Sequence, residues 1–170
     1  ISEDAVHACA VTNAGKAYCW GGVTSGQTGA GSWYGTKRPT PVYSDGVLSG
    51  VQLTDIATGG YHTCAILDND ETKCWGKNNY GQLGNGNNND TNVPGTAINF
   101  GLERTAVSII AGLVNTCAIL DNDETKCWGL DIGGNSNTYV ATPSSDINFG
   151  DGRSATSMSV GNGHICALLD

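Results

Sequence analysis

Cysteines at a fixed spacing are the residues of this chain best suited to chemistry. Three times, a cysteine is followed ten residues later by a second cysteine that precedes Trp-Gly. The pairs are Cys9 and Cys19, Cys64 and Cys74, and Cys117 and Cys127. Thiols that face each other across neighbouring strands can form a disulfide, so the spacing predicts three disulfide-bonded hairpins. Cys166 begins a fourth copy whose second cysteine would fall beyond Asp170, so we expect Cys166 to be unpaired here.

Two other roles for the cysteines stay open at this point. Reduced thiols can be buried as small hydrophobic side chains in a cytosolic protein. A Cys-His metal site is the second alternative, because His7 and His62 stand two residues before a cysteine and would share its strand face. Asn115 takes this position in the third copy, and the chain has no closely spaced cysteine pair of the zinc type. A hydrogen-bonding role for the histidines is therefore the preferred interpretation.

Two identical acidic segments lie between the paired cysteines. Residues 68–71 and 121–124 both read Asp-Asn-Asp-Glu. Closely spaced carboxylates can bind Ca²⁺, but an EF-hand-like loop needs a longer run with ligands at alternate positions. Asp and Asn also favour tight turns, so we expect turns and no cofactor, with Ca²⁺ as the alternative. No Ser-His-Asp or Cys-His arrangement can be identified, and the chain is predicted not to be an enzyme and to have no catalytic residue.

Short strands must position these residues. Pairing Cys64 with Cys74 leaves residues 68–70 as a three-residue hairpin loop. Such loops often hold their third residue in the left-handed conformation, which Gly, Asp and Asn tolerate. The third loop positions are Gly15, Asp70 and Asp123. The residues at the turns therefore agree with the register that the cysteines predict.

Side-chain alternation assigns each hairpin residue to one of two faces. In the second copy, Cys64, Ile66 and Cys74 share one face, and Leu67 and Trp75 share the other. The tryptophan after the second cysteine recurs once per copy, at positions 20, 75 and 128. This recurrence predicts a core residue that packs between neighbouring sheets.

The same unit repeats along the whole chain. The first cysteines of successive copies are 55, 53 and 49 residues apart, and a period near 50 is typical of a propeller or a solenoid. Glycine is abundant, with 25 of 170 residues, and no window shows helical periodicity. We predict an all-β fold in which residues 1–170 form three repeats of a larger β-propeller, with blades of four antiparallel strands and a break within a repeat at both ends.

Composition excludes some classes of partner. Eight Lys and Arg residues against sixteen Asp and Glu residues give a net charge of −8. A nucleic-acid-binding protein needs a basic surface to replace phosphate counterions, so no nucleic-acid partner is expected. The chain also has no apolar run of transmembrane length, and direct membrane insertion of this segment is not expected.

Two segments of the second copy resemble a known repeat family. Residues 56–63 read Ile-Ala-Thr-Gly-Gly-Tyr-His-Thr, and residues 75–84 read Trp-Gly-Lys-Asn-Asn-Tyr-Gly-Gln-Leu-Gly. These are similar to the signature segments of the regulator-of-chromosome-condensation repeat. Residues 26–29 keep Gly-Gln-Thr-Gly, whereas residues 128–134 have lost the Gln-Leu. The resemblance implies a propeller of usually seven four-stranded blades, of which this chain would form an arc.

The oxidised cysteines decide the predicted location. Disulfides persist outside the reducing cytosol, so an extracellular or cell-surface location is predicted. The predicted function is a non-catalytic module that presents loops for protein or glycan recognition, or that builds an extracellular assembly, including an assembly with copies of itself. The resemblance also implies an alternative, which is an intracellular guanine-nucleotide exchange factor or scaffold.

The Asn- and Gly-rich loops hold the candidate contact residues. Trp33 and Tyr34 occur in a Gly/Ser-rich loop, and Tyr80 lies in the corresponding region of the second copy. Exposed aromatic side chains are frequent anchors of binding surfaces. Asn89 begins an Asn-Asp-Thr sequon, which predicts a glycosylation site if the chain follows a secretory route.

Overall fold

The fold consists of β-strands and connecting loops. The computed structural model describes residues 1–3, 6–22, 24–42, 48, 50–130, 139–161 and 163–170, and no helix occurs in these ranges. The strands are β1 (Ser2–Glu3), β2 (His7–Val11), β3 (Ala17–Gly21), β4 (Thr36–Pro41), β5 (Leu53–Thr58), β6 (His62–Leu67), β7 (Thr72–Gly76), β8 (Ala106–Ala111), β9 (Asn115–Leu120), β10 (Thr125–Leu130), β11 (Tyr139–Asp146), β12 (Ala155–Val160) and β13 (Ile165–Leu169). The predicted all-β class is confirmed.

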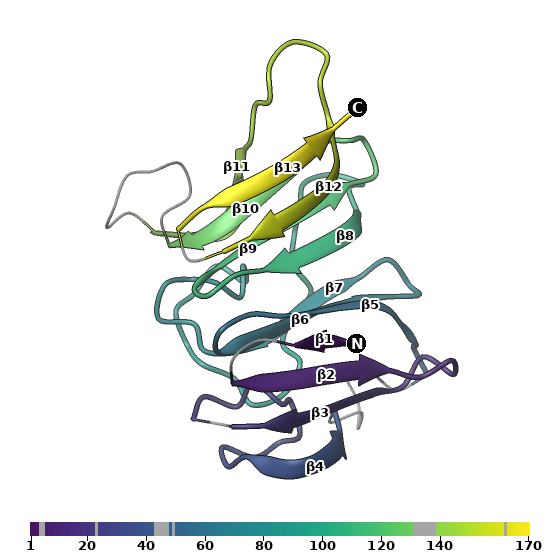
Figure 1. Cartoon of the computed structure of the whole chain (residues 1–170), viewed down its shortest axis with the longest axis vertical. Helices are drawn as coiled ribbons and strands as arrows, with labels where there is room; N and C mark the ends of the chain where they lie inside the picture. Colours follow the sequence, from purple (N-terminus) through teal and green to yellow (C-terminus); the bar gives the residue numbers. More distant parts are fainter. Residues whose placement is uncertain (4–5, 23, 43–47, 49, 131–138, 162) are drawn as a thin grey trace.

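The strands form successive antiparallel sheets, which follow one another along the molecule as blades (Figure 1). The first sheet contains β1 to β4 and the third contains β8 to β11, each in chain order from one edge to the other. The second sheet contains β5 to β7, and the fourth contains β12 and β13. The predicted blade of four antiparallel strands is therefore present in the first and third sheets.

A segment without a regular strand lies along β7 in the second sheet. Gly76 and Thr91 form an isolated antiparallel bridge. Farther along, the Gly95 N–H donates to the Cys74 carbonyl at 3.4 Å and the Ile98 N–H to the Thr72 carbonyl at 2.8 Å. Pro94 has no N–H and cannot add to the ladder. This segment takes the place that β4 and β11 occupy in the other blades, with fewer backbone bonds.

The hairpin that carries each cysteine pair has the register that the sequence predicts. Cys64 lies opposite Cys74 and Ile66 opposite Thr72. The third loop residues adopt the left-handed conformation, with φ of 68° at Gly15, 66° at Asp70 and 65° at Asp123. Local spacing and turn chemistry were thus sufficient to predict the conformation of the hairpin.

All three predicted disulfides are present in the structure. They join Cys9 to Cys19, Cys64 to Cys74 and Cys117 to Cys127, with Cα atoms 4.1 Å apart in each pair. This short separation is typical of opposite residues that do not exchange backbone hydrogen bonds. Closing a loop of this length contributes about 2–3 kcal/mol per bridge in the chain-entropy model. Cys166 is a free, exposed thiol.

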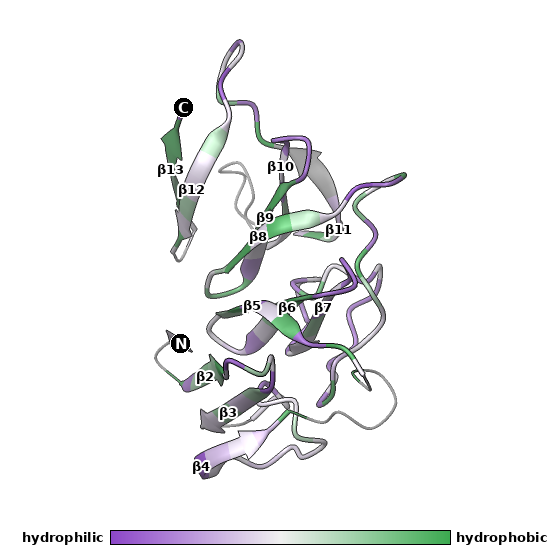
Figure 2. Ribbon diagram, turned by 90° about the vertical axis from the view of Figure 1, so that its right-hand side faces the viewer, coloured by the Kyte–Doolittle hydropathy of each residue, from purple (hydrophilic) through white to green (hydrophobic). Residues whose placement is uncertain are grey.

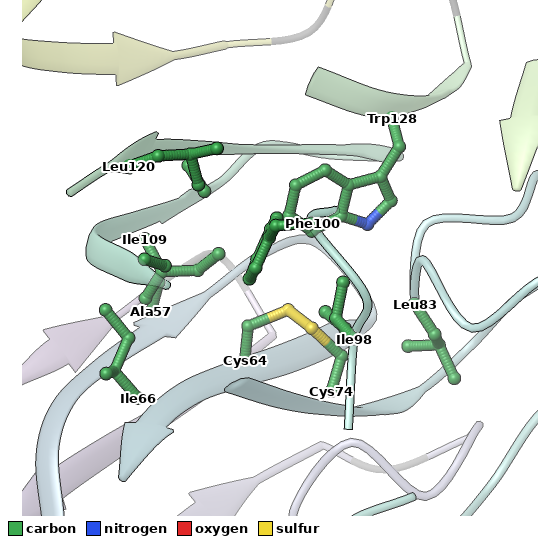
Figure 3. Close-up of a cluster of buried hydrophobic side chains, with 12 residues drawn as sticks. Ala57, Cys64, Ile66, Cys74, Leu83, Ile98, Phe100, Ile109, Leu120 and Trp128 are labelled. Carbon is green, nitrogen blue, oxygen red and sulfur yellow. A yellow bond between two sulfur atoms is a disulfide. The ribbon is translucent and has the colours of Figure 1, made fainter. Parts of the chain in front are cut away.

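The hydrophobic core lies between blades. One buried cluster contains the Cys64–Cys74 disulfide together with Leu120 and Trp128 of the third blade. Figure 3 shows the Trp128 ring beside Phe100, with ring centroids 5.9 Å apart. The second cluster contains the Cys9–Cys19 disulfide and Trp75. These two disulfides therefore pack against the tryptophan-bearing face of the following blade, as side-chain alternation predicts.

The acidic segments form turns that bind the backbone of the neighbouring strand. The Asp68 carboxylate accepts a hydrogen bond from the Gln52 N–H at 3.0 Å, and Asp121 accepts one from the Thr105 N–H at 3.1 Å. The pairs are reciprocal, because the Asp68 and Asp121 N–H groups donate to the Gln52 and Thr105 carbonyls. No group of three or more metal-ligating side chains occurs among the described residues. Calcium binding stays an untested alternative.

Successive strands of each sheet are antiparallel neighbours, so the connections after alternate strands lie at opposite ends of the sheet. Tight turns therefore lie on one face of the molecule and long loops on the other (Figure 1). The tight-turn face carries the cysteine-hairpin loops at residues 12–15, 68–70 and 121–123. The long-loop face carries residues 22–35, which connect β3 to β4, and residues 77–90, which follow β7. The long connections of the first and second blades, as far as the structure describes them, thus extend in one direction.

Candidate binding surface on the long-loop face

A buried Gly-Gln-x-Gly segment anchors each described long loop. Residues 26–29 and 81–84 hold this sequence, and the side chains of Gln27 and Gln82 have no exposed surface. The Gln82 main-chain carbonyl accepts a hydrogen bond from the Trp128 indole N–H of the next blade at 2.9 Å. The Gln27 carbonyl accepts the equivalent bond from Trp75 at 3.0 Å. The recurrent tryptophan therefore fixes the long loop of the preceding blade.

A histidine and a threonine complete this contact, which we call the clasp. The Thr116 hydroxyl donates to the Gln82 carbonyl, and His62 Nε2 lies within hydrogen-bond distance of Thr116 Oγ1, both at 2.8 Å. Because the single hydroxyl proton points to the carbonyl, His62 Nε2 must carry its own proton and donate it. The first clasp has the same bonds and comprises His7, Gln27, Thr63 and Trp75.

Glycine permits the close approach of loop and indole. A β-carbon on Gly84 would lie 2.6 Å from Trp128 Nε1, and one on Gly29 would lie 2.5 Å from Trp75 Nε1. Backbone bonds tie the same loops to the next blade, from the Gly31 N–H to the Asn92 carbonyl and from the Gly86 N–H to the Ala141 carbonyl. The loops are thus held from two sides.

Asn78 organises the second long loop from within. Its side chain is fully buried, and its Oδ1 accepts a hydrogen bond from the Leu83 N–H at 2.9 Å. Its Nδ2 donates to the Asn87 carbonyl at 2.8 Å, and its N–H donates to the Asp90 carboxylate at 2.7 Å. Through its side chain and its main-chain N–H, Asn78 therefore fixes the path of the chain from Leu83 to Asp90.

The predicted contact residues lie exposed at the tips of these loops. The exposed fractions are 46% for Trp33, 82% for Tyr34 and 38% for Tyr80. Tyr139 is half exposed, and its hydroxyl accepts a hydrogen bond from Asn88 Nδ2 at 3.1 Å. The tips of successive loops therefore contribute aromatic side chains to one face of the molecule. Asn89 is exposed in the same loop, and its glycosylation stays an untested prediction.

Charge differs between the two faces. Residues 22–35 contain no Asp, Glu, Lys, Arg or His, and residues 77–90 contain one cation, Lys77, and one carboxylate, Asp90. Lys77 lies over the Tyr61 ring at 5.2 Å. The tight-turn face instead carries the two Asp-Asn-Asp-Glu segments, with Arg104 paired to Asp121 at 3.1 Å. The long-loop face is therefore nearly neutral in a chain of strongly acidic composition.

The third junction lacks two members of the clasp. Asn115 stands where His7 and His62 stand, and Ile165 stands where Thr63 and Thr116 stand. Asn115 is buried, and its Oδ1 has no hydrogen-bond partner in the described structure. The corresponding long loop, residues 131–138, lies outside the described residues, as does the predicted loss of Gln-Leu at that point.

Burial keeps His62, the histidine of the second clasp, neutral. Desolvation, with a smaller contribution from the charge of His7, lowers the pKa of His62 from 6.5 to about 3. A second proton would have to bind His62 Nδ1, which is buried without a partner. The folded state therefore disfavours the charged imidazole.

Stability should fall as the pH falls below 6.5. Between 6.5 and about 3 the unfolded chain binds a proton at His62 that the folded chain does not. Each pH unit in this window costs about 1.4 kcal/mol, so we expect a loss of about 2 kcal/mol from pH 6.5 to 5.0. Urea unfolding at both pH values, compared between the natural chain and His62→Asn, measures how much of the pH dependence of the unfolding free energy comes from His62. Equal pH dependence in the two proteins would contradict the assignment.

Comparison with known proteins identifies the repeat. Residues 53–82 and 74–119 match the Regulator of chromosome condensation (RCC1) repeat. The chain belongs to the RCC1 repeat family. It is 35% identical over 120 residues to the RCC1 domain-containing protein RUG3, mitochondrial, of Arabidopsis thaliana, a match that covers 71% of this chain and 26% of RUG3. It is 30% identical to the human E3 ubiquitin-protein ligase HERC2 over 76% of this chain and 3% of HERC2.

Solved structures show the same fold. Human WBSCR16 superposes with a TM-score of 0.82 at 24% identity, over 97% of this chain and 43% of that chain. Yeast RCC1 (Prp20), determined with bound Kap60, superposes with a TM-score of 0.79 at 18% identity, over 96% and 40%. The chain therefore has the RCC1 propeller architecture, and it spans less than half the length of each of these four proteins.

The predicted extracellular or cell-surface location is wrong. RUG3, which is 35% identical to this chain, is a mitochondrial protein rather than a secreted one. The prediction failed because it took the cysteine spacing as evidence of compartment. In an RCC1 hairpin the spacing follows from a register that brings opposite Cα atoms to 4.1 Å, so it reports the geometry of the hairpin.

Two features of the surface were not identified from the sequence. The Gly-Gln-x-Gly segment marked the family, but the role of its main-chain carbonyl as a double acceptor depends on the next blade. Asn78 lies within the signature segment, but its role in ordering the loop depends on contacts that only the fold creates.

No described helix is long and apolar enough to cross a membrane.

Proposed function

We propose that this chain is a non-catalytic part of an RCC1 propeller that acts inside the cell as a protein-binding scaffold, and that the long-loop face makes the contact. The observation that carries the proposal is the set of exposed aromatic tips, Trp33, Tyr34 and Tyr80, on loops whose bases are buried and hydrogen bonded. Neither face offers a group of residues arranged for catalysis among those described.

The composition of the loops supports protein recognition. Residues 24–35 and 77–90 consist mainly of Gly, Asn, Ser, Thr and Tyr, with one Trp. Antibody binding loops use the same residue types, because Tyr and Trp give large contact areas at low entropic cost and Ser, Gly and Asn adapt their hydrogen bonds. The neutral charge of this face also suits the desolvated centre of a protein interface.

The clasps support the same proposal through rigidity. Binding costs less free energy when the contact loops are already ordered. Trp75 and Trp128 hold the loop bases from below, and Asn78 fixes the interior of the second loop. RCC1-type relatives also have protein partners, as the Prp20–Kap60 complex shows for that protein.

A surface variant tests the proposal. Replacing Trp33, Tyr34 and Tyr80 by alanine should leave the unfolding free energy within about 1 kcal/mol, because these side chains are exposed. Proteins cross-linked to the immobilised chain in an extract of its source should be lost with this variant. The matched control carries Glu71→Gln and Glu124→Gln on the tight-turn face and should keep them. Identical capture by the natural chain and both variants would refute the proposal.

A further inference from the structure

The second blade has an irregular outer segment, residues 91–98, where the first blade has the strand β4. Few backbone bonds join this segment to β7, namely the Gly76–Thr91 bridge and the bonds that Gly95 and Ile98 donate. In the first blade, β4 pairs with β3 as a strand of the sheet. Figure 2 shows the second blade between the strands of the first and third sheets. The outer segment therefore depends more on side-chain packing than β4 does.

The side chains that hold the outer segment in place pack around the Cys64–Cys74 disulfide. Ile98 and the nearby Phe100 are buried in the same hydrophobic cluster as this disulfide. Figure 3 shows both side chains beside the two bonded sulfur atoms. Cys74 lies on β7, and the disulfide bonds it to β6. The disulfide thus forms part of the surface on which the outer segment rests.

The outer segment also closes the long loop at residues 77–90. The Gly76 N–H donates to the Thr91 carbonyl at 2.7 Å, and the Thr91 N–H donates to the Gly76 carbonyl at 3.0 Å. The next contact within the loop is the bond from the Asn78 N–H to the Asp90 carboxylate. Movement of the outer segment would strain both contacts, so the order of the long loop depends on the position of this segment.

We propose that the Cys64–Cys74 disulfide is a redox-sensitive switch that holds the outer segment and, through it, the long loop at residues 77–90. Two separate thiols need more room than a disulfide, and a closely packed cluster has little room to give. In the reduced chain Ile98 and Phe100 must therefore move, and few backbone bonds oppose this movement. The consequence for partner binding rests on the function proposed above, in which this loop is part of the contact surface.

A thiol such as glutathione supplies the electrons for the reduction. Its thiolate attacks one sulfur of the disulfide to form a mixed disulfide, while the other cysteine leaves as a thiolate and takes up a proton. A second glutathione thiolate attacks the glutathione sulfur of the mixed disulfide, which releases the first cysteine and forms glutathione disulfide. One disulfide and two thiols thus give one disulfide and two thiols. Because Cys64 and Cys74 are buried, the outer segment must open before the first attack.

The first blade provides a matched comparison within the chain. Val42 and Ile98 are equivalent, because the Val42 N–H donates to the Ala17 carbonyl at 3.1 Å as the Ile98 N–H donates to the Thr72 carbonyl at 2.8 Å. Val42 is also buried in the cluster that contains its own blade's disulfide. Val42 directly follows β4, however, whereas Ile98 belongs to the irregular segment. The proposal therefore predicts a strong response to reduction at Ile98 and a weak one at Val42.

Hydrogen exchange of the natural chain measures this difference. The oxidised chain is compared with the chain reduced by dithiothreitol, and mass spectrometry shows that the disulfides are open. We expect the Ile98 amide to exchange about tenfold faster after reduction, and the Val42 amide to stay within about twofold. An unchanged Ile98 amide in the reduced chain would overturn the proposal. An equal increase at Val42 would also overturn it, because the whole fold would then have loosened.

The double variant Cys64→Ala and Cys74→Ala assigns the effect to this disulfide. The variant keeps the other two disulfides but has no sulfur at this position, so dithiothreitol should leave the exchange of its Ile98 amide unchanged. An increase as large as that of the natural chain would mean that another disulfide causes the effect, and the proposal would be wrong.

These exchange measurements need no binding partner, so they test the switch independently of the proposed function. Cross-linking capture by the oxidised and the reduced natural chain then tests the consequence for binding. Capture that falls on reduction supports it. Unchanged capture, together with faster exchange at Ile98, would refute the consequence for binding and leave the switch itself in place.

Discussion

Trp128→Ala is expected to destabilise the fold by about 4 kcal/mol, within the range of about 3–5 kcal/mol for truncating a buried tryptophan. The side chain has no exposed surface, contacts Phe100 in the cluster around the Cys64–Cys74 disulfide, and donates to the Gln82 carbonyl. Its loss removes apolar contacts between two blades and one of the two hydrogen bonds that the Gln82 carbonyl of the preceding long loop accepts. Urea unfolding of the purified chain measures the change.

Trp20→Ala is the matched control. Trp20 follows Cys19 as Trp128 follows Cys127, but it is only partly buried, and it lies in the first sheet, so that no earlier sheet packs on it among the described residues. We expect it to cost less than half as much as Trp128→Ala. Equal costs for the two variants would show that the tryptophan acts within its own blade, which would contradict the inter-blade role argued for the clasp.

Local features of the hairpin could be predicted from the sequence because they depend on neighbouring residues only. The ten-residue spacing fixes which residues lie opposite, and the loop then needs a residue such as Asp70 that tolerates positive φ. Alternation next assigns Cys64 and Trp75 to opposite faces, and the two core clusters contain them separately. Each step uses a constraint within about a dozen residues.

Contacts between blades could not be predicted in the same way. The main-chain carbonyl of Gln82 accepts hydrogen bonds from Thr116 and Trp128, which are 34 and 46 residues away in the sequence. Every residue has a main-chain carbonyl, so the residue type of Gln82 does not show that its carbonyl binds the next blade. The signature segment therefore indicated the family but not this structural role of Gln82. The predicted location was wrong for a related reason. The spacing of a cysteine pair shows which two side chains can lie opposite each other, but it does not show the compartment in which the protein works.

Covariation inside the chain gives the clasp further support. At two junctions a histidine is paired with a threonine on the next blade, as in His62 with Thr116. At the third junction both partners change together, to Asn115 and Ile165. An isoleucine side chain cannot accept the hydrogen bond that a histidine Nε2–H donates. A direct contact between the two positions therefore requires that both residues change together. The chain thus contains its own comparison of junctions with and without the polar clasp.

Gly76→Ala is expected to destabilise the fold by about 4 kcal/mol, since two costs add. The φ of Gly76 is +109°, a conformation that L residues adopt at about 1–3 kcal/mol. A β-carbon there would also lie 2.5 Å from the Tyr61 carbonyl oxygen and 2.7 Å from the His62 Cα. These are backbone atoms of the paired strand, so relief requires β6 and β7 to separate, at about 1–3 kcal/mol.

Gly150→Ala isolates the first of these costs. Gly150 has a similar φ of +104°, but a β-carbon there would meet nothing within 4 Å. We expect its cost to stay near that of the backbone conformation alone, about 1–3 kcal/mol, and clearly below that of Gly76→Ala in parallel urea unfolding. The difference between the two variants measures how tightly Gly76 at the end of β7 is packed against the backbone of the neighbouring strand. Equal costs would show that this packing relaxes freely and that the glycine is needed only for its φ.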